Sequence, residues 1–120
     1  MHLRALEADA VRALHELVGE DPELFDELVA TFLEDGPQRI AELRRAVDGG
    51  DSESAGRAAH TLKTNGATFG ATELASLCRR LEAAARADEL AAAAGLVDHV
   101  EQSWVLVRSD LTSLGQGKPG

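Results

Sequence analysis

The stretch of sequence that decides the fold spans residues 60–82 and reads HTLKTNGATFGATELASLCRRLE. At about 100° per residue, apolar and small side chains form one helical stripe before Gly70 and a second stripe after it. The first stripe consists of Ala55, Ala59, Leu62, Gly66 and Phe69, and the second of Leu74, Leu77, Cys78, Leu81 and Ala85. The pattern predicts two helices, over about residues 51–68 and 71–87, joined by a turn at Gly70.

One histidine lies off the first stripe and is expected on the solvent side of its helix. The neighbours of His60 on that side are Lys63, Thr64 and Ala67, with Gly56 one turn earlier. Imidazole has an unperturbed pKa of about 6.5, so at neutral pH much of it is an uncharged nucleophile. A phosphoryl group on the ring would place negative charge about one turn from the Lys63 ammonium. These surroundings suit a phosphate carrier better than a buried acid or base.

The longer pattern resembles the histidine phosphotransfer (HPt) domain of multistep phosphorelays. The residues that carry the resemblance are His60-x-Leu62-Lys63, Gly66, Gly70, Leu74, Cys78 and Leu81-Glu82, together with Asp21-Pro22-Glu23, Phe32-Leu33 and Gly50-Asp51. It covers most of residues 3–112. The chain departs from the family at Thr64, where glycine is usual, and this bears on the rate of transfer and the choice of partner.

The resemblance implies a role for three residues. His60 would accept a phosphoryl group from a receiver-domain aspartyl phosphate and pass it to another receiver aspartate. Lys63 would balance the phosphate charge, and Glu82 would hydrogen-bond the imidazole Nδ1 and leave Nε2 facing the partner. The expected partners are response-regulator receiver domains and a sensor or hybrid histidine kinase. The receiver would supply Mg²⁺, and we expect no cofactor or metal bound by this domain itself.

Two other functions stay open from the sequence. One is the histidine-bearing substrate domain of a chemotaxis-type kinase, whose phosphoryl donor is ATP bound to another domain. The other is an adaptor that binds receivers without phosphotransfer. The sequence has no glycine-rich phosphate loop, so we expect a phosphocarrier rather than an enzyme with its own ATP site.

Composition indicates a single helical domain. The chain has 120 residues, of which 44% are hydrophobic, only 3% are aromatic and none is tyrosine. A net charge of −9 argues against a nucleic-acid partner. The single cysteine, Cys78, lies on an apolar stripe and is expected to be a core thiol in a reducing, cytoplasmic setting. We find neither a signal-peptide pattern nor an apolar run long enough for a membrane span.

Three further helices complete the prediction, over about residues 5–18, 22–48 and 89–113. The first has an apolar stripe of Leu6, Ala10, Ala13, Leu14 and Leu17, the second is one long bent helix through Gly36-Pro37, and the third carries Ala93, Val97, Val100, Trp104, Val107 and Leu111. We therefore predict an all-α fold, an antiparallel up-and-down four-helix bundle with an additional short N-terminal helix. The HPt domain would span 3–113, with 114–120 a flexible tail. His2, His15 and His99 are expected to have no function, and Arg57 to border the docking face.

Overall fold

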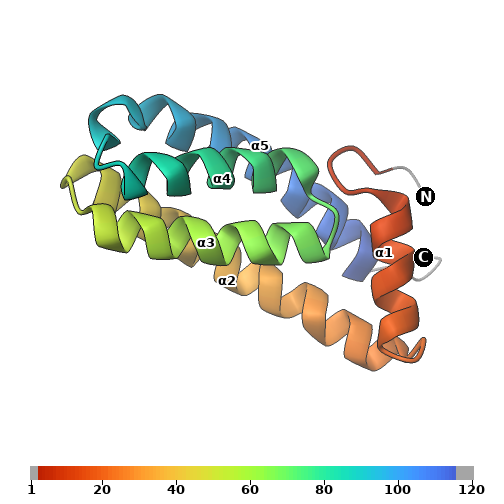
Figure 1. Cartoon of the computed structure of the whole chain (residues 1–120). Coiled ribbons are helices and arrows are strands. Elements are labelled where there is room, and N and C mark those ends of the chain that lie inside the picture. Colours follow the sequence, from red (N-terminus) through yellow and green to blue (C-terminus); the bar gives the residue numbers. More distant parts are fainter. Residues whose placement is uncertain (1–2, 116–120) are drawn as a thin grey trace.

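Four long helices pack side by side in residues 3–115, the part of the chain that the computed structural model describes (Figure 1). They are α2 (Pro22–Asp48), α3 (Ser52–Thr68), α4 (Thr72–Arg86) and α5 (Ala94–Gly115). Helices α2 and α4 each contact both α3 and α5, so the four form a closed ring in cross-section. The predicted all-α four-helix bundle is confirmed, and the additional short helix α1 (Ala8–Leu17) lies across one end of it.

Capping side chains explain where two of the helices begin. Asp21 accepts hydrogen bonds from the backbone N–H groups of Glu23 and Leu24 at 3.0 and 3.3 Å, and Pro22 occupies the first helical position. Asp51 caps α3 in the same way, at 3.1 Å from the Ser54 nitrogen. These caps set the starts of α2 and α3, and α2 then continues through Pro37 as a single helix.

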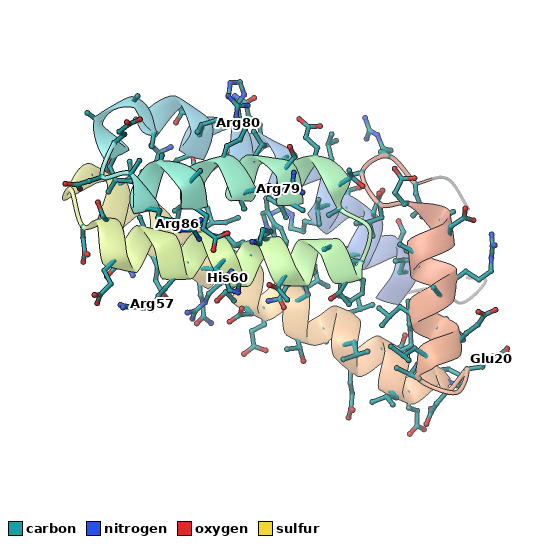
Figure 2. The ribbon with its side chains drawn as sticks, in the orientation of Figure 1. Glu20, Arg57, His60, Arg79, Arg80 and Arg86 are labelled. Atoms are coloured by element: carbon teal, nitrogen blue, oxygen red, sulfur yellow. The ribbon has the colours of Figure 1, made fainter. Side chains whose placement is uncertain are left out.

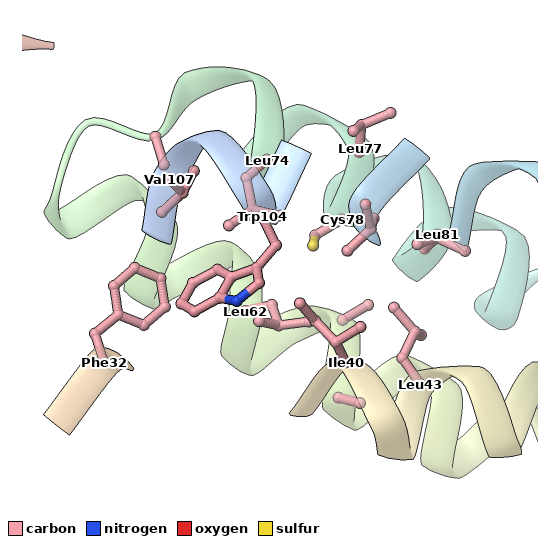
Figure 3. Packing of buried hydrophobic residues seen from close by; sticks show 14 of the residues in the cluster. Phe32, Ile40, Leu43, Leu62, Leu74, Leu77, Cys78, Leu81, Trp104 and Val107 are labelled. Atoms are coloured by element: carbon pink, nitrogen blue, oxygen red, sulfur yellow. The ribbon is translucent and has the colours of Figure 1, made fainter. Parts of the chain in front are cut away.

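The core is made by the stripes that the sequence predicts for α3, α4 and α5, together with apolar residues of α2 such as Phe32, Ile40 and Leu43 (Figure 3). Every residue of those three stripes is buried. Leu62, Leu74 and Cys78 have no exposed surface at all. Burial raises the pKa of the Cys78 thiol to about 12, and the negative charge of Glu82 adds to the effect. The predicted assignment of Cys78 to the core is confirmed.

Gly36 lets α2 approach the largest side chain of the core. A Cβ atom placed on Gly36 would lie 2.4 Å from the Trp104 ring, closer than any ordinary contact. Phe32, one turn before Gly36 on α2, also contacts the ring, in an edge-on arrangement with centroids 5.2 Å apart. Trp104 is 6% exposed and has little room to move.

We therefore predict that Gly36→Ala destabilises the protein by about 1–2 kcal/mol, because overpacking outweighs the better helix propensity of alanine. Gly56→Ala is the matched control, since a Cβ there meets Ala85 at an ordinary 3.6 Å and should be neutral or stabilising. Urea unfolding of the two variants measures both values. Equal effects of the two substitutions would contradict the role assigned to Gly36.

Helix α1 differs from the prediction at its start and on its buried face. It begins at Ala8 instead of near residue 5, and both Ala13 and Leu17 are exposed, Leu17 to 81%. The residues of this region that are buried are Leu6, Val11 and Leu14. The reason is that α1 crosses the end of the bundle (Figure 1), so only part of one face meets the core.

A buried carboxylate holds the segment before α1 in place. Asp110 of α5 is 3% exposed and accepts hydrogen bonds from the backbone N–H groups of Arg4, Ala5 and Leu6 at 2.9, 2.7 and 2.9 Å. The three N–H groups of the segment that precedes Ala8 are thus satisfied by this carboxylate. Asp110 thereby joins α5 to residues 4–6.

The turn between α3 and α4 also contacts this N-terminal segment. Gly70 has φ of 73°, a conformation that favours glycine, and its carbonyl accepts from the Glu7 nitrogen at 3.0 Å. A Cβ atom at Gly70 would lie 2.7 Å from that of Ala10. Glycine is therefore needed here both for the turn and for the approach of α1.

The last helix also differs from its predicted bounds. The segment predicted to begin it near residue 89 forms a separate 3-10 turn, η1 (Leu90–Ala92), and α5 itself starts at Ala94. At its other end α5 runs to Gly115, two residues beyond the predicted end at 113. The remainder of the predicted tail, 116–120, lies outside the described residues.

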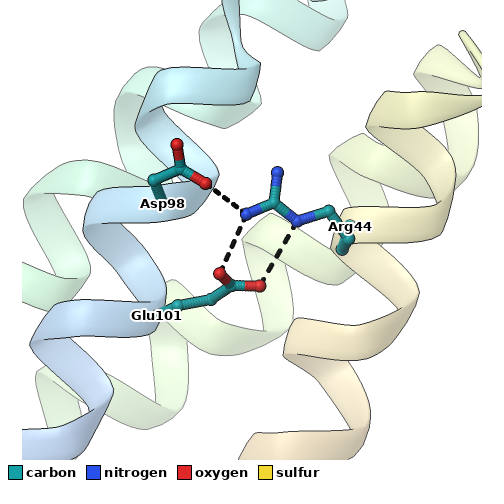
Figure 4. A network of polar contacts seen from close by, with 3 residues as sticks. All are labelled: Arg44, Asp98 and Glu101. Carbon is teal, nitrogen blue, oxygen red and sulfur yellow. Dashed lines mark hydrogen bonds and ion pairs between the residues drawn. The ribbon is translucent and has the colours of Figure 1, made fainter.

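An ion-pair network joins α2 to α5 on the outside of the bundle (Figure 4). The Arg44 guanidinium donates to Asp98 and to both carboxylate oxygens of Glu101, the shorter bond to Glu101 being 2.8 Å. Hydrogen bonds to Glu101 and then to Asp98 raise the pKa of Arg44 above its ordinary value.

Within residues 3–115, no helix is long and apolar enough to cross a membrane.

Candidate functional site

His60 lies in the middle of α3 on the solvent side (Figure 2). Its side chain is 60% exposed, whereas its neighbours Ala59 and Leu62 are fully buried. The 3.6-residue period of the helix produces this difference, since the apolar stripe and His60 point in different directions. The structure thus places His60 on the face that the sequence predicts for it.

Glu82 reaches the His60 ring from the neighbouring helix. Its Oε2 atom lies 2.9 Å from the imidazole Nδ1, and its side chain is only 14% exposed. Helix α4 brings it there because Glu82 follows Leu81 at the edge of the buried stripe that packs α4 against α3. An ionised carboxylate can only accept hydrogen bonds, so this contact fixes the proton on Nδ1 and leaves the Nε2 lone pair unprotonated in the neutral ring.

Lys63 contacts the same carboxylate, which the sequence did not predict. Its Nζ atom donates to Glu82 Oε1 at 2.6 Å, and the lysine side chain is 28% exposed. The pKa of Glu82 is lowered, chiefly by this hydrogen bond and also by the one to His60, against the opposing effect of partial burial. One carboxylate therefore holds both the ring and the cation that the sequence singled out.

Two arginines stand beside the histidine around an open hollow of about 460 Å³. Arg86 Nη2 lies 3.7 Å from Glu82 Oε2, and Arg57 donates to Glu53 at 2.9 Å. Gly56 and Thr61 also line the hollow and keep the approach to His60 unobstructed. Sequence reasoning missed Arg86, although its position four residues after Glu82 on one helix was a usable signal.

The lowered pKa of Glu82 leads to a prediction for Lys63→Ala. Removing the main cause of the shift should raise the pKa of the Glu82 carboxyl, as measured by carbon NMR titration. A carboxyl with a depressed folded pKa stabilises the fold above its unfolded pKa of about 4.3, and this contribution is lost as pH falls through the folded value. The loss should therefore occur at higher pH in the variant. Arg57→Ala is the control, because among the described residues Arg57 pairs with Glu53 and forms no ion pair with Glu82. An unchanged titration of Glu82 in Lys63→Ala would contradict the assignment.

The other histidines have different surroundings. His15 packs against Phe25 with ring centroids 4.8 Å apart, His99 is exposed on α5, and His2 lies outside the described residues. Thr64 is exposed on α3, where its carbonyl accepts from the Thr68 hydroxyl at 3.1 Å. No group of three potential metal ligands occurs in the part of the chain that the structure covers.

Comparison with known proteins identifies the family and the fold. The family model described as the Hpt domain matches residues 27–116. The fold is similar to the crystal structure of histidine-containing phosphotransfer protein B from Pseudomonas aeruginosa PAO1, with a TM-score of 0.87 and 27% sequence identity. That match covers 98% of this chain and 100% of the other. No curated protein matches the sequence. The chain belongs to the Hpt domain family, the histidine phosphotransfer carriers of phosphorelays.

Proposed function

We propose that His60 is the phosphoryl acceptor of this carrier, with Lys63 and Glu82 as the residues that assist it. The observation that carries the proposal is the geometry at the ring. Its Nδ1 is held by Glu82 at 2.9 Å, while the side chain is 60% exposed and Nε2 has no hydrogen bond to any residue that the structure describes. A neutral imidazole with its outward nitrogen unprotonated is the form that acts as a nucleophile.

The transfer step follows from this geometry. The Nε2 lone pair attacks the phosphorus of a receiver aspartyl phosphate and forms the N–P bond. The P–O bond to aspartate breaks, and its electron pair returns to the receiver carboxylate. The ring keeps its Nδ1 proton and becomes positive, and the Glu82 carboxylate at 2.9 Å balances that charge. The reverse step delivers the phosphoryl group to another receiver aspartate.

Positioning and charge compensation supply the catalysis in this scheme. Lys63 lies one turn from His60 and has three N–H donors, so it can meet the phosphoryl oxygens as they arrive. The receiver contributes Mg²⁺ and the acidic residues that hold it, and the domain needs no cofactor or ATP site of its own. A sensor or hybrid histidine kinase stands upstream, and the setting is cytoplasmic.

The exposed surface around His60 serves as the receiver docking face. Gly56 and Arg57 line the hollow beside the ring, and the small residues Thr64 and Ala67 are exposed about one and two turns further along α3. Thr64 occupies the position where the family usually has glycine, so its side chain reduces the space through which a receiver domain can reach the His60 ring. We propose that Thr64→Gly changes the relative rates with different receivers more than it changes the phosphohistidine itself.

Incubation with labelled phosphorylated receiver domains tests the proposal. Transfer of label to His60, mapped by mass spectrometry, supports a phosphorelay carrier. Labelling only by an ATP-loaded kinase core would favour the chemotaxis-type substrate domain. Receiver binding without label transfer would favour the adaptor.

A further inference from the structure

Phosphorylation of His60 creates a competition between Glu82 and the phosphoryl group for the Lys63 ammonium. In the unphosphorylated protein one oxygen accepts from His60 Nδ1 at 2.9 Å and the other from Lys63 Nζ at 2.6 Å. A phosphoryl group on Nε2 brings additional negative charge one turn from Lys63 and attracts its ammonium. As Lys63 turns toward the phosphoryl oxygens, Glu82 loses its main compensating charge while it is only 14% exposed to water.

Arg86 is a second cation close enough to Glu82 to replace the positive charge of Lys63. Its Nη2 atom lies 3.7 Å from Glu82 Oε2, close enough for attraction and too far for a hydrogen bond. Arg86 follows Glu82 by one helical turn on α4, and its side chain is 78% exposed. Figure 2 places Arg86 on α4 near His60 of α3, and both residues line the same hollow of about 460 Å³. The guanidinium therefore has space to close the remaining gap.

We propose that Arg86 is a positioning residue that supplies the cation paired with Glu82 when His60 is phosphorylated, approaching Oε2 as Lys63 leaves Oε1. The inference rests on the proposed function of His60. Arg86 frees the lysine for the phosphoryl group and keeps the Glu82 carboxylate paired with a cation. It acts through Glu82, the residue with which it pairs among the described residues of the unphosphorylated protein.

Other nearby arginines do not fit this role. Arg57 is engaged with Glu53 at 2.9 Å and with Ser54 at 3.3 Å, both on its own helix. Arg79 and Arg80 are exposed on α4, and neither forms an ion pair with Glu82 among the described residues. Arg86 alone of the four arginines approaches the carboxylate within 4 Å in this part of the chain.

The test compares Arg86→Gln with Glu82→Gln and with the double variant, after phosphorylation by the small-molecule donor phosphoramidate. Arg86→Gln should shorten the lifetime of the phosphohistidine by about twofold to fivefold, the range of one partly exposed ion pair. The same change in the Glu82→Gln background should have no further effect, because the carboxylate through which Arg86 acts is gone. Arg86→Lys should restore part of the lifetime, and Arg80→Gln is the matched control.

A second measurement separates positioning from a structural role. In Arg86→Gln the Glu82 carboxyl should titrate at higher pH than in the parent when His60 is phosphorylated. It should titrate as in the parent when His60 is unphosphorylated, because Lys63 is then in place. A change of lifetime that persists in the Glu82→Gln background would overturn the proposal and point to direct contact with the phosphoryl group. A parent protein that accepts no phosphoryl group on His60 would refute the proposed function. If the parent is phosphorylated on His60 and Arg86→Gln leaves the phosphohistidine lifetime unchanged, only this inference is refuted.

Discussion

Replacing His60 by glutamine is expected to abolish phosphorylation of the protein while leaving the bundle folded. Glutamine has no nitrogen that can form a phosphohistidine, and the position is 60% exposed, so no core contact is lost. Incubation with a phosphorylated receiver should label the parent and give no label in the variant. Acid lability and base stability of the label in the parent would identify the bond as N–P.

His99→Gln is the matched control for that experiment. His99 is also exposed on a long helix, but among the described residues it forms no ion pair with a carboxylate and has no lysine bonded to the same group. It should be phosphorylated and unfold like the parent. Recovery of the phosphoryl group on His15 or His99 of the unmodified protein would refute the assignment to His60.

The largest effect on stability is expected for Asp110→Ala. The substitution removes the acceptor of three backbone N–H groups, and that of Leu6 is buried. Hydrogen bonds to a charged group contribute more than neutral ones, and the unpaired donors remain after the acceptor is lost. We expect a decrease of about 3 kcal/mol in the free energy of unfolding, measured by urea titration.

Asp98→Ala on the same helix is the control for Asp110→Ala. Asp98 is 60% exposed and takes part in the surface network around Arg44, so its loss should cost less than about 1 kcal/mol. Asp110→Asn should decrease the free energy of unfolding by less than Asp110→Ala and by more than Asp98→Ala, since its amide keeps one uncharged acceptor oxygen. Similar effects of Asp110→Ala and Asp98→Ala would show that the N-terminal segment is not held by the buried carboxylate.

Periodicity was sufficient to predict most of the fold. The stripes of α3, α4 and α5 were recognised residue by residue because each helix lies along the bundle and buries one continuous face. Helix α1 was predicted less well because it crosses the bundle end, and a stripe calculated along its whole length included exposed Leu17. Asp110 was missed, although its position three residues after Val107 placed a carboxylate on the core side of α5.

The candidate site was predicted in part. The position of Glu82 at Nδ1 came from the family resemblance and agrees with the observed distance of 2.9 Å. Its contact with Lys63 was not predicted, because the register between α3 and α4 depends on packing across the turn at Gly70. The catalytic roles of the three residues stay predictions for the experiments described above.

Because Cys78 is buried, its thiol can serve as a natural chemical probe of local opening of the bundle at α4. The thiol is the only one in the chain, has no exposed surface, and with a pKa of about 12 is almost entirely protonated near neutral pH. A cysteine reagent needs an accessible thiolate, so modification requires a fluctuation that separates α4 from its neighbours. The rate of modification in native buffer therefore reports how often the helix that carries Glu82 leaves its place, without any engineered label.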